Sequence, residues 1–424
     1  MTQPPRAAAP AAAHHPLRAW WDAFAAVAAG VAAMAVVAAL GLWAAGATGL
    51  PGGAFPSVVA ATVVTAVGGS VELSGGAGFF GRTGASLDVV PLSVTLAGAV
   101  AIAVVFLLPL RHRAVASGGE LLGRVARTAV LWLLALVLIT LAARHTFRID
   151  LGDSLIGDIG AALGATPVVG FRAAMAPTLG LGLLWLLVLL ALAVAVSRKT
   201  PLPSRLLRFQ DAVRPAAFAM LVVLLAYVVL GLVVGVVVLC TRGHPAQTVA
   251  VLLLGLPNLA WLGFGMGLGG TWDGRVPDAI GLPVPKALAA VLRVKHGTAA
   301  VNVSSLAEQD GRAWLLVALA VVALLAAGFV TAVRSPARTA PWRHGVRLAV
   351  ALAVTLLVVG ALTRISARFG LSLLGVGDLG GFGGEVTLRP RLWTLLGLGL
   401  LWGLIAGTLG GVCAWRVRRR GELP

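Results

Sequence analysis

The chain has 424 residues, of which 59% are hydrophobic and only 11% are charged, and its mean hydropathy is +0.97. Ordinary soluble domains contain about 25% charged residues and a smaller apolar share. This composition excludes a water-soluble enzyme, a disordered chain and a disulfide-rich secreted domain. What remains is a protein that crosses a membrane several times.

The net charge of +18 comes from 33 Lys and Arg residues against 15 Asp and Glu residues. In a soluble chain this excess would suggest binding to nucleic acid, because basic surfaces attract phosphates. In a membrane protein, Lys and Arg instead collect in cytoplasmic loops. We therefore expect no nucleic-acid partner, and we use the charge as information about topology.

In chain order, residues 1–22 form an Ala- and Pro-rich segment that we expect to be a disordered cytoplasmic tail. A single transmembrane domain is predicted over 23–413, and 414–424 form a basic cytoplasmic tail. A helix needs roughly 20 apolar residues to cross about 30 Å of hydrocarbon. Eight such spans are predicted, each without a charged residue in its central part: 23–46, 90–110, 126–143, 176–197, 216–240, 313–333, 345–363 and 392–413.

A further apolar segment, 247–270, is interrupted by Gly-Leu-Pro-Asn and ends in a run of glycines. With eight spans and both termini cytoplasmic, the inner segments carry a net charge of +15 and the outer segments +3. A ninth crossing would turn the basic loop 334–347 and the C-terminal tail outward, against the positive-inside rule. We therefore predict that 247–270 is a re-entrant or interfacial segment on the outer side.

The eight spans group into four helical hairpins, which predicts an all-α, polytopic transmembrane helix bundle. The first, second and fourth outer loops are Gly-rich and resemble one another, and each has a proline near the start of the returning helix: Pro91, Pro177 and Pro390. Proline suits the first helical turn, where its missing N–H has no helical partner. The similarity fits an internal duplication, or simply four loops filled with glycine.

Two neighbouring residues, Pro257 and Asn258, are the best polar candidates at membrane depth. The Asn258 side chain could serve a ligand, or it could cap backbone groups at the proline; we favour capping because Asn prefers helix starts. The glycines that follow, 263–270, lack the preceding strand and the lysine of a phosphate-binding loop. Close packing of helices explains these glycines better.

Carboxylates in two outer loops form a second candidate group: Asp153 and Asp158, close to Asp150, with Asp378 and Glu385 in the fourth hairpin. Together they could bind a divalent cation, since Ca²⁺ and Mg²⁺ prefer oxygen ligands. Ordinary Gly-Asp turns explain them better, so we expect no metal and no cofactor. The chain shows no HExxH or GxSxG motif, so we expect no enzymatic activity.

The two cysteines, Cys240 and Cys413, each end a predicted span, and the topology puts them on opposite faces of the membrane. A disulfide requires Cα atoms within about 7 Å of each other. We therefore expect both thiols to be free.

The stretch GLPNLAWLGFGMGLGGTW (255–272), together with the Trp20–Trp21 entry and helix starts of the PLSVTLAG type, resembles the streptophobe family. These are very hydrophobic actinobacterial membrane proteins, and the resemblance implies a multi-pass protein of the bacterial plasma membrane. This resemblance implies no catalytic or binding residues.

Three functions compete, and the least favoured is a membrane enzyme, which would need clustered nucleophiles or metal ligands that the sequence does not show. A non-catalytic scaffold or regulator would have the lipid bilayer and other membrane proteins as partners. The alternative is a permease or channel for a small solute that uses 247–270. We favour the scaffold, because coupled transport usually needs a titratable group near the midplane of the membrane.

Overall fold

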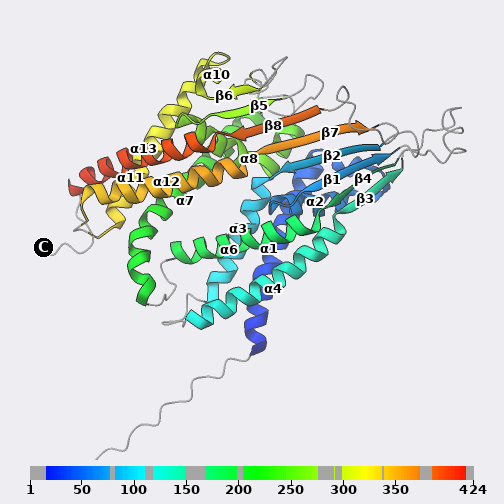
Figure 1. The fold of residues 1–424 in the computed structure, drawn as a ribbon, viewed down its shortest axis with the longest axis horizontal. Helices are drawn as coiled ribbons and strands as arrows, with labels where there is room; N and C mark the ends of the chain where they lie inside the picture. Colours follow the sequence, from blue (N-terminus) through cyan, green and yellow to red (C-terminus); the bar gives the residue numbers. More distant parts are fainter. Residues whose placement is uncertain are drawn as a thin grey trace, which may run out of the picture.

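A computed structural model of the chain shows a bundle of long helices with a β-sheet at one end (Figure 1). Apart from the single positions Gly243 and Val291, the structure describes residues 16–76, 82–109, 118–148, 168–197, 204–241, 245–275, 298–336, 339–372 and 384–416.

Among these residues, eight helices are long and apolar enough to cross a membrane, so the protein is a multi-pass helical membrane protein. They are α1 (Pro16–Ala44), α4 (Gly118–Ala142), α6 (Met175–Val196), α7 (Ser204–Thr241), α8 (Pro245–Gly267), α11 (Leu315–Arg334), α12 (Pro341–Leu362) and α13 (Leu392–Cys413). Seven of them match predicted spans. The eighth, α8, is the segment we expected to be re-entrant, whereas the predicted span 90–110 forms the shorter α3 (Leu92–Leu107).

The loops that we predicted to be outer contain strands that we had not expected. Eight strands form one antiparallel sheet with the order β3-β4-β1-β2-β7-β8-β5-β6. They are β1 (Val71–Gly76), β2 (Arg82–Val89), β3 (Arg144–Arg148), β4 (Val168–Ala173), β5 (Trp272–Arg275), β6 (Ala299–Val301), β7 (Ile365–Ser372) and β8 (Gly384–Pro390). Pairing between strands of different loops satisfies backbone N–H and C=O groups that pairing within one loop leaves open.

The sheet has one apolar and one polar face, because successive side chains of a strand point to opposite sides. Strand β3 shows this alternation, reading Arg-His-Thr-Phe-Arg. On the apolar face, Trp272, Val301 and Leu388 are buried in the same hydrophobic cluster as residues of the helices. The polar face includes the exposed residues Glu72 and Arg144. The apolar face therefore attaches the sheet to the bundle.

The predicted four hairpins are present, and each carries one pair of strands between its helices. The pair β1–β2 lies between α1 and α3, β3–β4 between α4 and α6, β5–β6 between α7 and α11, and β7–β8 between α12 and α13. In the sheet, the order β3-β4-β1-β2 of the first two hairpins recurs as β7-β8-β5-β6 in the last two. The chain therefore consists of two halves of the same topology, joined where β2 pairs with β7.

The helices of the two halves also pack in corresponding ways. In the first half α1 packs on α3 and α4, and α6 packs on the same two helices. In the second half α7 packs on α11 and α12, and α13 packs on the same two. The short helix α2 (Phe55–Ala66) contacts α1, α3 and α4, just as α8 contacts α7, α11 and α12. Helix α2 is thus the counterpart of α8, although α8 is about twice as long.

The ends of α2 and α8 agree in detail. Each helix ends in a Gly-Gly turn whose first glycine is left-handed, with φ +90° at Gly68 and +93° at Gly269. The following glycine donates its N–H to the carbonyl five residues earlier, at 3.0 Å for Gly69 and 2.9 Å for Gly270. This bonding belongs to a Schellman cap, which needs a residue that tolerates positive φ.

The segments that follow these turns are also bonded alike. The Ser70 carbonyl accepts from the N–H of Ala174, which begins α6, and the Thr271 carbonyl accepts from Arg391, which begins α13. The strand registers correspond too, since Val71 pairs with Ala173 as Trp272 pairs with Pro390. Of the two explanations that the sequence left open, the structure favours duplication of a unit of two hairpins.

Helix α8 lies between the two halves and contacts α1 and α3 as well as its own half. The chain enters it from the sheet end of α7 and leaves it through Gly269 into strand β5 of the sheet. Its last turn lies inside the bundle, where the Leu268 carbonyl accepts from the Trp402 indole of α13 at 3.2 Å. Our expectation that the segment is broken was wrong, because α8 runs without interruption through Pro257.

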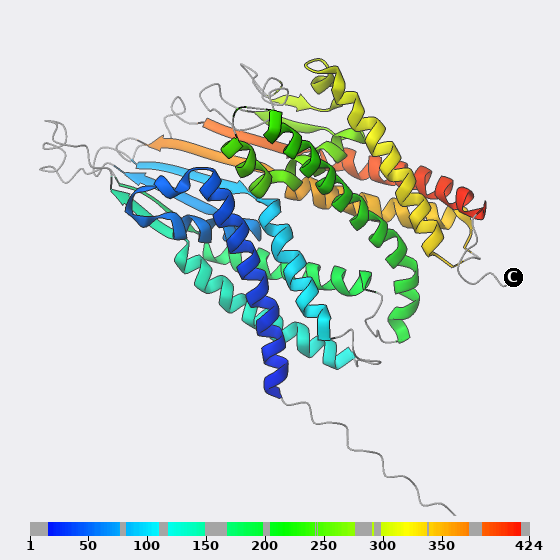
Figure 2. The ribbon, with the colours of Figure 1, turned by 180° about the vertical axis from the view of Figure 1, so that it is seen from behind.

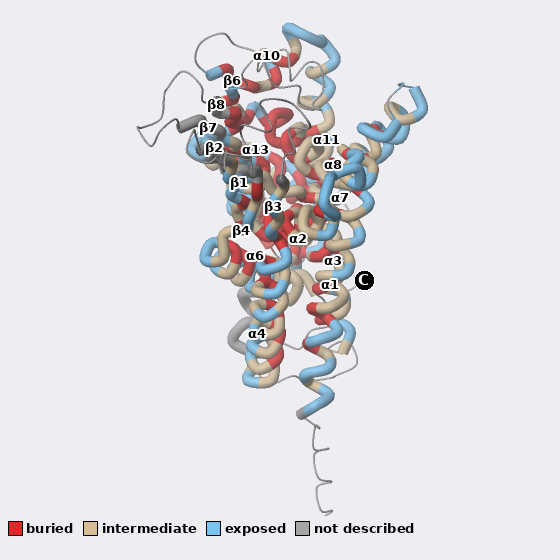
Figure 3. Tube along the Cα trace, turned by 90° about the vertical axis from the view of Figure 1, so that its right-hand side faces the viewer, coloured by how far each residue is buried: buried red, intermediate tan, exposed pale blue. Residues whose placement is uncertain are grey.

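Buried residues run along the middle of the molecule and exposed ones surround it (Figure 3). Away from the sheet, the helices of the two halves diverge (Figures 1 and 2). Exposed apolar side chains such as Val229 and Val233 of α7 suit contact with lipid. Cys240 and Cys413 are both free and exposed, as we expected.

Candidate functional site

The predicted candidate Asn258 connects the two halves. Its side-chain carbonyl accepts from the backbone N–H of Leu92 at 3.0 Å, and its amide nitrogen donates to the Val90 carbonyl at 2.8 Å. Leu92 is the first residue of α3, where the backbone N–H has no partner within the helix. Asn258 therefore caps a helix, although the helix is α3 rather than its own.

A second bond reinforces this junction near the proline. The Ser93 hydroxyl donates to the carbonyl of Leu252 in α8 at 3.1 Å. Pro257 itself is buried and has no N–H to donate, so α8 lacks one hydrogen bond in this region. The start of α3 thus docks on the turn of α8 that the proline weakens.

The predicted carboxylate group cannot be assembled from the described residues, because Asp153, Asp158 and Asp378 lie outside them. Glu385 lies in β8, where its backbone pairs with Arg368 of β7. No three His, Cys, Asp or Glu residues in the described part of the chain are grouped as a metal site would require.

A charged row that we did not predict crosses the polar face of the sheet. In the first half, the register places Arg144 of β3 opposite Arg172 of β4, and Arg172 opposite Glu72 of β1. Arg172 pairs with Glu72 at 3.1 Å, and both side chains are exposed, at 76% and 51%. Exposed ion pairs of this kind contribute about 0–1 kcal/mol.

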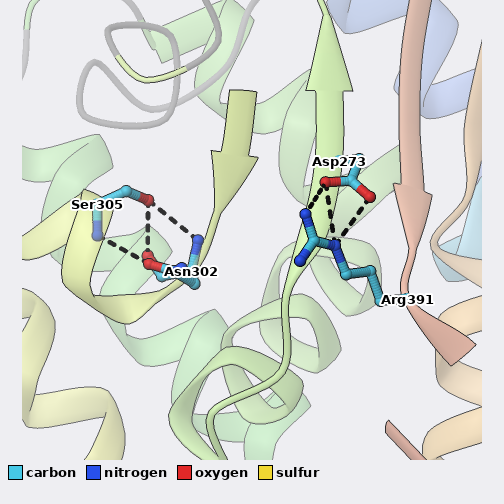
Figure 4. Close-up of polar contacts among 4 residues, drawn as sticks. All are labelled: Asp273, Asn302, Ser305 and Arg391. Atoms are coloured by element: carbon cyan, nitrogen blue, oxygen red, sulfur yellow. Dashed lines mark hydrogen bonds and ion pairs between the residues drawn. The ribbon is translucent and has the colours of Figure 1, made fainter. Parts of the chain in front are cut away.

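The second half contains the equivalent row. Arg389 of β8 lies opposite Asp273 of β5, and Arg364 directly precedes Ile365, the residue that pairs with Leu388. Continuing this register by one step places Arg364 opposite Arg389. Asp273 forms an ion pair with Arg391, in which a guanidinium nitrogen lies 2.8 Å from a carboxylate oxygen (Figure 4). The hydrogen bond and the charge of Asp273 raise the pKa of Arg391.

These rows could have been noticed in the sequence. The strands alternate polar and apolar residues, and an arginine follows directly after the spans 126–143 and 345–363. We assigned those arginines only to the positive charge of the outer loops, because the glycine-rich loop sequences predicted turns and not strands. Only cross-strand pairing shows that the arginines lie beside one another.

The end of the bundle away from the sheet contains two contacts between an arginine and a phenylalanine ring. The Arg124 guanidinium of α4 lies 4.9 Å from the Phe106 ring centre, and that of Arg334 lies 3.6 Å from the Phe218 ring. His344 of α12 is fully buried. These contacts hold the helices together at the end away from the sheet.

The Asn302 side chain forms hydrogen bonds with residues that directly follow it in the chain (Figure 4). Its side chain accepts from the Ser305 N–H at 2.9 Å and from the Ser304 hydroxyl at 2.6 Å. It thereby caps the short helix α10 (Val303–Ala307). The polar groups between β6 and α11 are therefore used in local structure.

No family model, characterised protein or solved structure matches the chain.

Proposed function

We propose that the protein is a non-catalytic scaffold or regulator of the bacterial plasma membrane, with both termini in the cytoplasm and the sheet outside. The orientation is supported by the charge distribution, +15 in the predicted inner segments and +3 in the outer ones. We also propose, from the stretch 255–272, that the chain is a streptophobe.

One observation carries the scaffold proposal. A single sheet of eight strands runs across both halves and couples them through β2 and β7. Its apolar face is buried against the helices, whereas its polar face is exposed in the first half, at Glu72, Ser74, Arg144 and Thr146. In the second half, Ser366 and Thr387 of the polar face are buried. The exposed surface suits contact with other proteins of the envelope.

Photo-crosslinking in living cells tests the scaffold. A photoreactive residue at Ser74 or Thr146, both exposed on the polar face, should give a discrete protein adduct of constant mass. The same residue at Val229 on the outside of α7 should label lipid instead. Absence of a protein adduct from both sheet positions would remove the support for a scaffold.

A permease is the second candidate, and the duplication favours it. Transporters are often built from two repeats, with the substrate site next to short or Pro-interrupted helices in equivalent positions. Helices α2 and α8 occupy such positions. A cysteine replacing Gly263 on α8, in a background lacking Cys240 and Cys413, should react with a small charged thiol reagent if a hydrated path exists. If the scaffold proposal is right, the cysteine at position 263 should remain unmodified.

A further inference from the structure

Strand β3 forms one edge of the sheet, whereas its equivalent in the second half lies inside the sheet. The strand order is β3-β4-β1-β2-β7-β8-β5-β6, in which β3 and β7 hold equivalent positions in the two halves. Among the described residues, β3 pairs only with β4, whereas β7 pairs with β8 and, on its other side, with β2 of the first half. An edge strand presents backbone N–H and C=O groups to which a further strand can bind. The described part of the fold therefore fills this edge in one half and leaves it open in the other.

The two equivalent strands share a pattern of side chains. In each, two arginines flank a hydroxyl residue on the polar face: Arg144, Thr146 and Arg148 in the first half, and Arg364, Ser366 and Arg368 in the second. The registers fix this correspondence, because Thr146 lies opposite the residue three positions before Ala173, and Ser366 lies opposite the residue three positions before Pro390. The second half therefore shows which kind of strand this pattern accepts.

Strand β2 occupies the equivalent edge in the second half. It runs antiparallel to β7 and places Asp88 directly opposite Ser366. Asp88 is thus the diagonal neighbour of both Arg364 and Arg368, a separation that long side chains can reach across a sheet. With its edge filled, Ser366 is buried, whereas its counterpart Thr146 is exposed. A strand that carries a carboxylate opposite the hydroxyl residue therefore complements this edge.

On the open edge, the neighbouring strands do not supply this carboxylate. Strand β4 contains no Asp or Glu, and Glu72 of β1 already forms an ion pair. Arg144 and Arg148 are both exposed. On the apolar face, the ring centres of His145 and Phe147 are 4.8 Å apart, and both side chains are only partly buried. The edge therefore offers two cations on one face and two incompletely covered rings on the other.

We propose that the edge of β3 binds an extended acidic segment of another envelope protein by strand addition, with a carboxylate opposite Thr146 and between Arg144 and Arg148. Main-chain hydrogen bonds provide the affinity in this mode of binding, and alternate side chains provide the specificity. Apolar residues on either side of the carboxylate lie opposite His145 and Phe147, in the order Leu-Asp-Val that β2 contains. This inference rests on the scaffold proposal, because it names the kind of partner that the scaffold holds.

A second copy of the chain does not fit this edge. Antiparallel pairing along the full length of two β3 strands places each Arg144 opposite an Arg148, and like charges directly opposite each other repel. The other edge strand, β6, ends at Val301. The position equivalent to Asp88 is then Asn302, a neutral residue whose side chain caps α10. Charges on an edge strand thus prevent self-association, and the same charges favour an acidic partner.

Fluorescence anisotropy with the detergent-purified full chain tests the proposal. The probe is a labelled peptide, Gly-Ala-Ser-Leu-Asp-Val-Val, which has the sequence of residues 84–90. The peptide should bind saturably, and replacing its Asp by Asn should weaken binding about fivefold, because the attraction to two arginines is lost. Absence of saturable binding at millimolar peptide, or equal binding of the Asp and Asn peptides, would overturn the proposal. Both peptides are compared on the unchanged protein, so this result does not depend on the folding of a variant.

Variants of the protein locate the binding site. Arg144→Gln/Arg148→Gln should weaken binding of the Asp peptide by the same factor, and the change of Asp to Asn in the peptide should then have no further effect. The matched control Arg275→Gln/Arg312→Gln removes the same charge from exposed positions elsewhere at the sheet end, and it should bind the peptide as the unchanged protein does. Equal weakening in both double variants would show non-specific attraction and would contradict the proposal.

Two comparisons separate this proposal from its alternatives. A labelled peptide with the sequence of β3, Arg-His-Thr-Phe-Arg, should not bind, and its binding would assign the edge to a second copy and overturn the proposal. A protein adduct at Ser74 in cells, without peptide binding to the purified chain, would support the scaffold and overturn the edge site. Peptide binding without an adduct from Ser74 or Thr146 would support the edge site and remove the support for the scaffold.

Discussion

At the scale of single residues, Asn258 shows how a polar side chain is used within an apolar helix. Its amide both donates and accepts, and both bonds reach the segment that begins α3. A buried polar group without partners would be costly in an apolar surrounding. Asn258 avoids this cost and at the same time holds the two halves together, so its role is structural.

Replacing Asn258 by alanine should lower the free energy of unfolding by about 1–2 kcal/mol, because the N–H of Leu92 and the carbonyl of Val90 both lose their partner. The thermal unfolding midpoint of the purified protein in detergent measures the effect. Gln247→Ala is the control, since Gln247 is exposed near the start of the same helix. Equal midpoints for the two variants would contradict the capping role.

At the scale of elements, the second half is packed through glycines on α13. Gly399, Gly403 and Gly407 recur every four residues and lie on one side of the helix. A Cβ at Gly403 would be 2.7 Å from the Ala349 nitrogen of α12. Small residues at this spacing let two helix backbones approach closely, as membrane helices often do.

A pair of glycines on α13 tests this packing. A Cβ at Gly410 would collide with the backbone of Gly328 in α11, so Gly410→Ala should destabilise the protein by about 1–3 kcal/mol. A Cβ at Gly397 meets nothing within 4 Å. Gly397→Ala should therefore leave stability unchanged or raise it slightly, because alanine favours a helix. Thermal unfolding of both variants in detergent gives the comparison, and a reversed order would refute the packing argument.

At the scale of the whole molecule, the sheet is what unites the duplicated halves. Beyond the contacts of α8, β2 and β7 form the ladder that crosses the boundary between them. The ladder therefore joins the two sets of four strands into one sheet.

The register of this ladder can be tested by crosslinking. In a background lacking Cys240 and Cys413, the pair Ser86→Cys and Arg368→Cys should form a disulfide, because these residues lie directly opposite each other. The pair Asp88→Cys and Arg368→Cys is offset by two residues from this register, so it should form a disulfide far less readily. Gel mobility after mild oxidation, with and without reductant, provides the measurement.

Labelling of single cysteines tests the proposed orientation. In the same background, Arg275→Cys in β5 should react with an impermeant thiol reagent on intact cells, whereas Ala340→Cys at the start of α12 should react only after the membrane is opened. Labelling of position 340 in intact cells would invert the assignment of sides.

Predictions from the sequence were reliable where one segment decides the outcome. Seven of the predicted spans are long apolar helices, because the apolar length alone commits a segment to the membrane. The site was harder to predict. Asn258 was identified as a cap, but its target lies 166 residues away in the chain. The arginine rows were missed because each combines strands from separate hairpins.

The amino-acid sequence by itself determined that this is a multi-pass helical membrane protein and which segments carry its positive charge, since hydropathy and charge are properties of single segments. Only the tertiary structure decided that the glycine-rich loops form one sheet, that the halves are equivalent, and that arginines and acids from different hairpins lie side by side. Strand pairing depends on partners far apart in the chain, and residues within one loop do not specify the loop that they pair with.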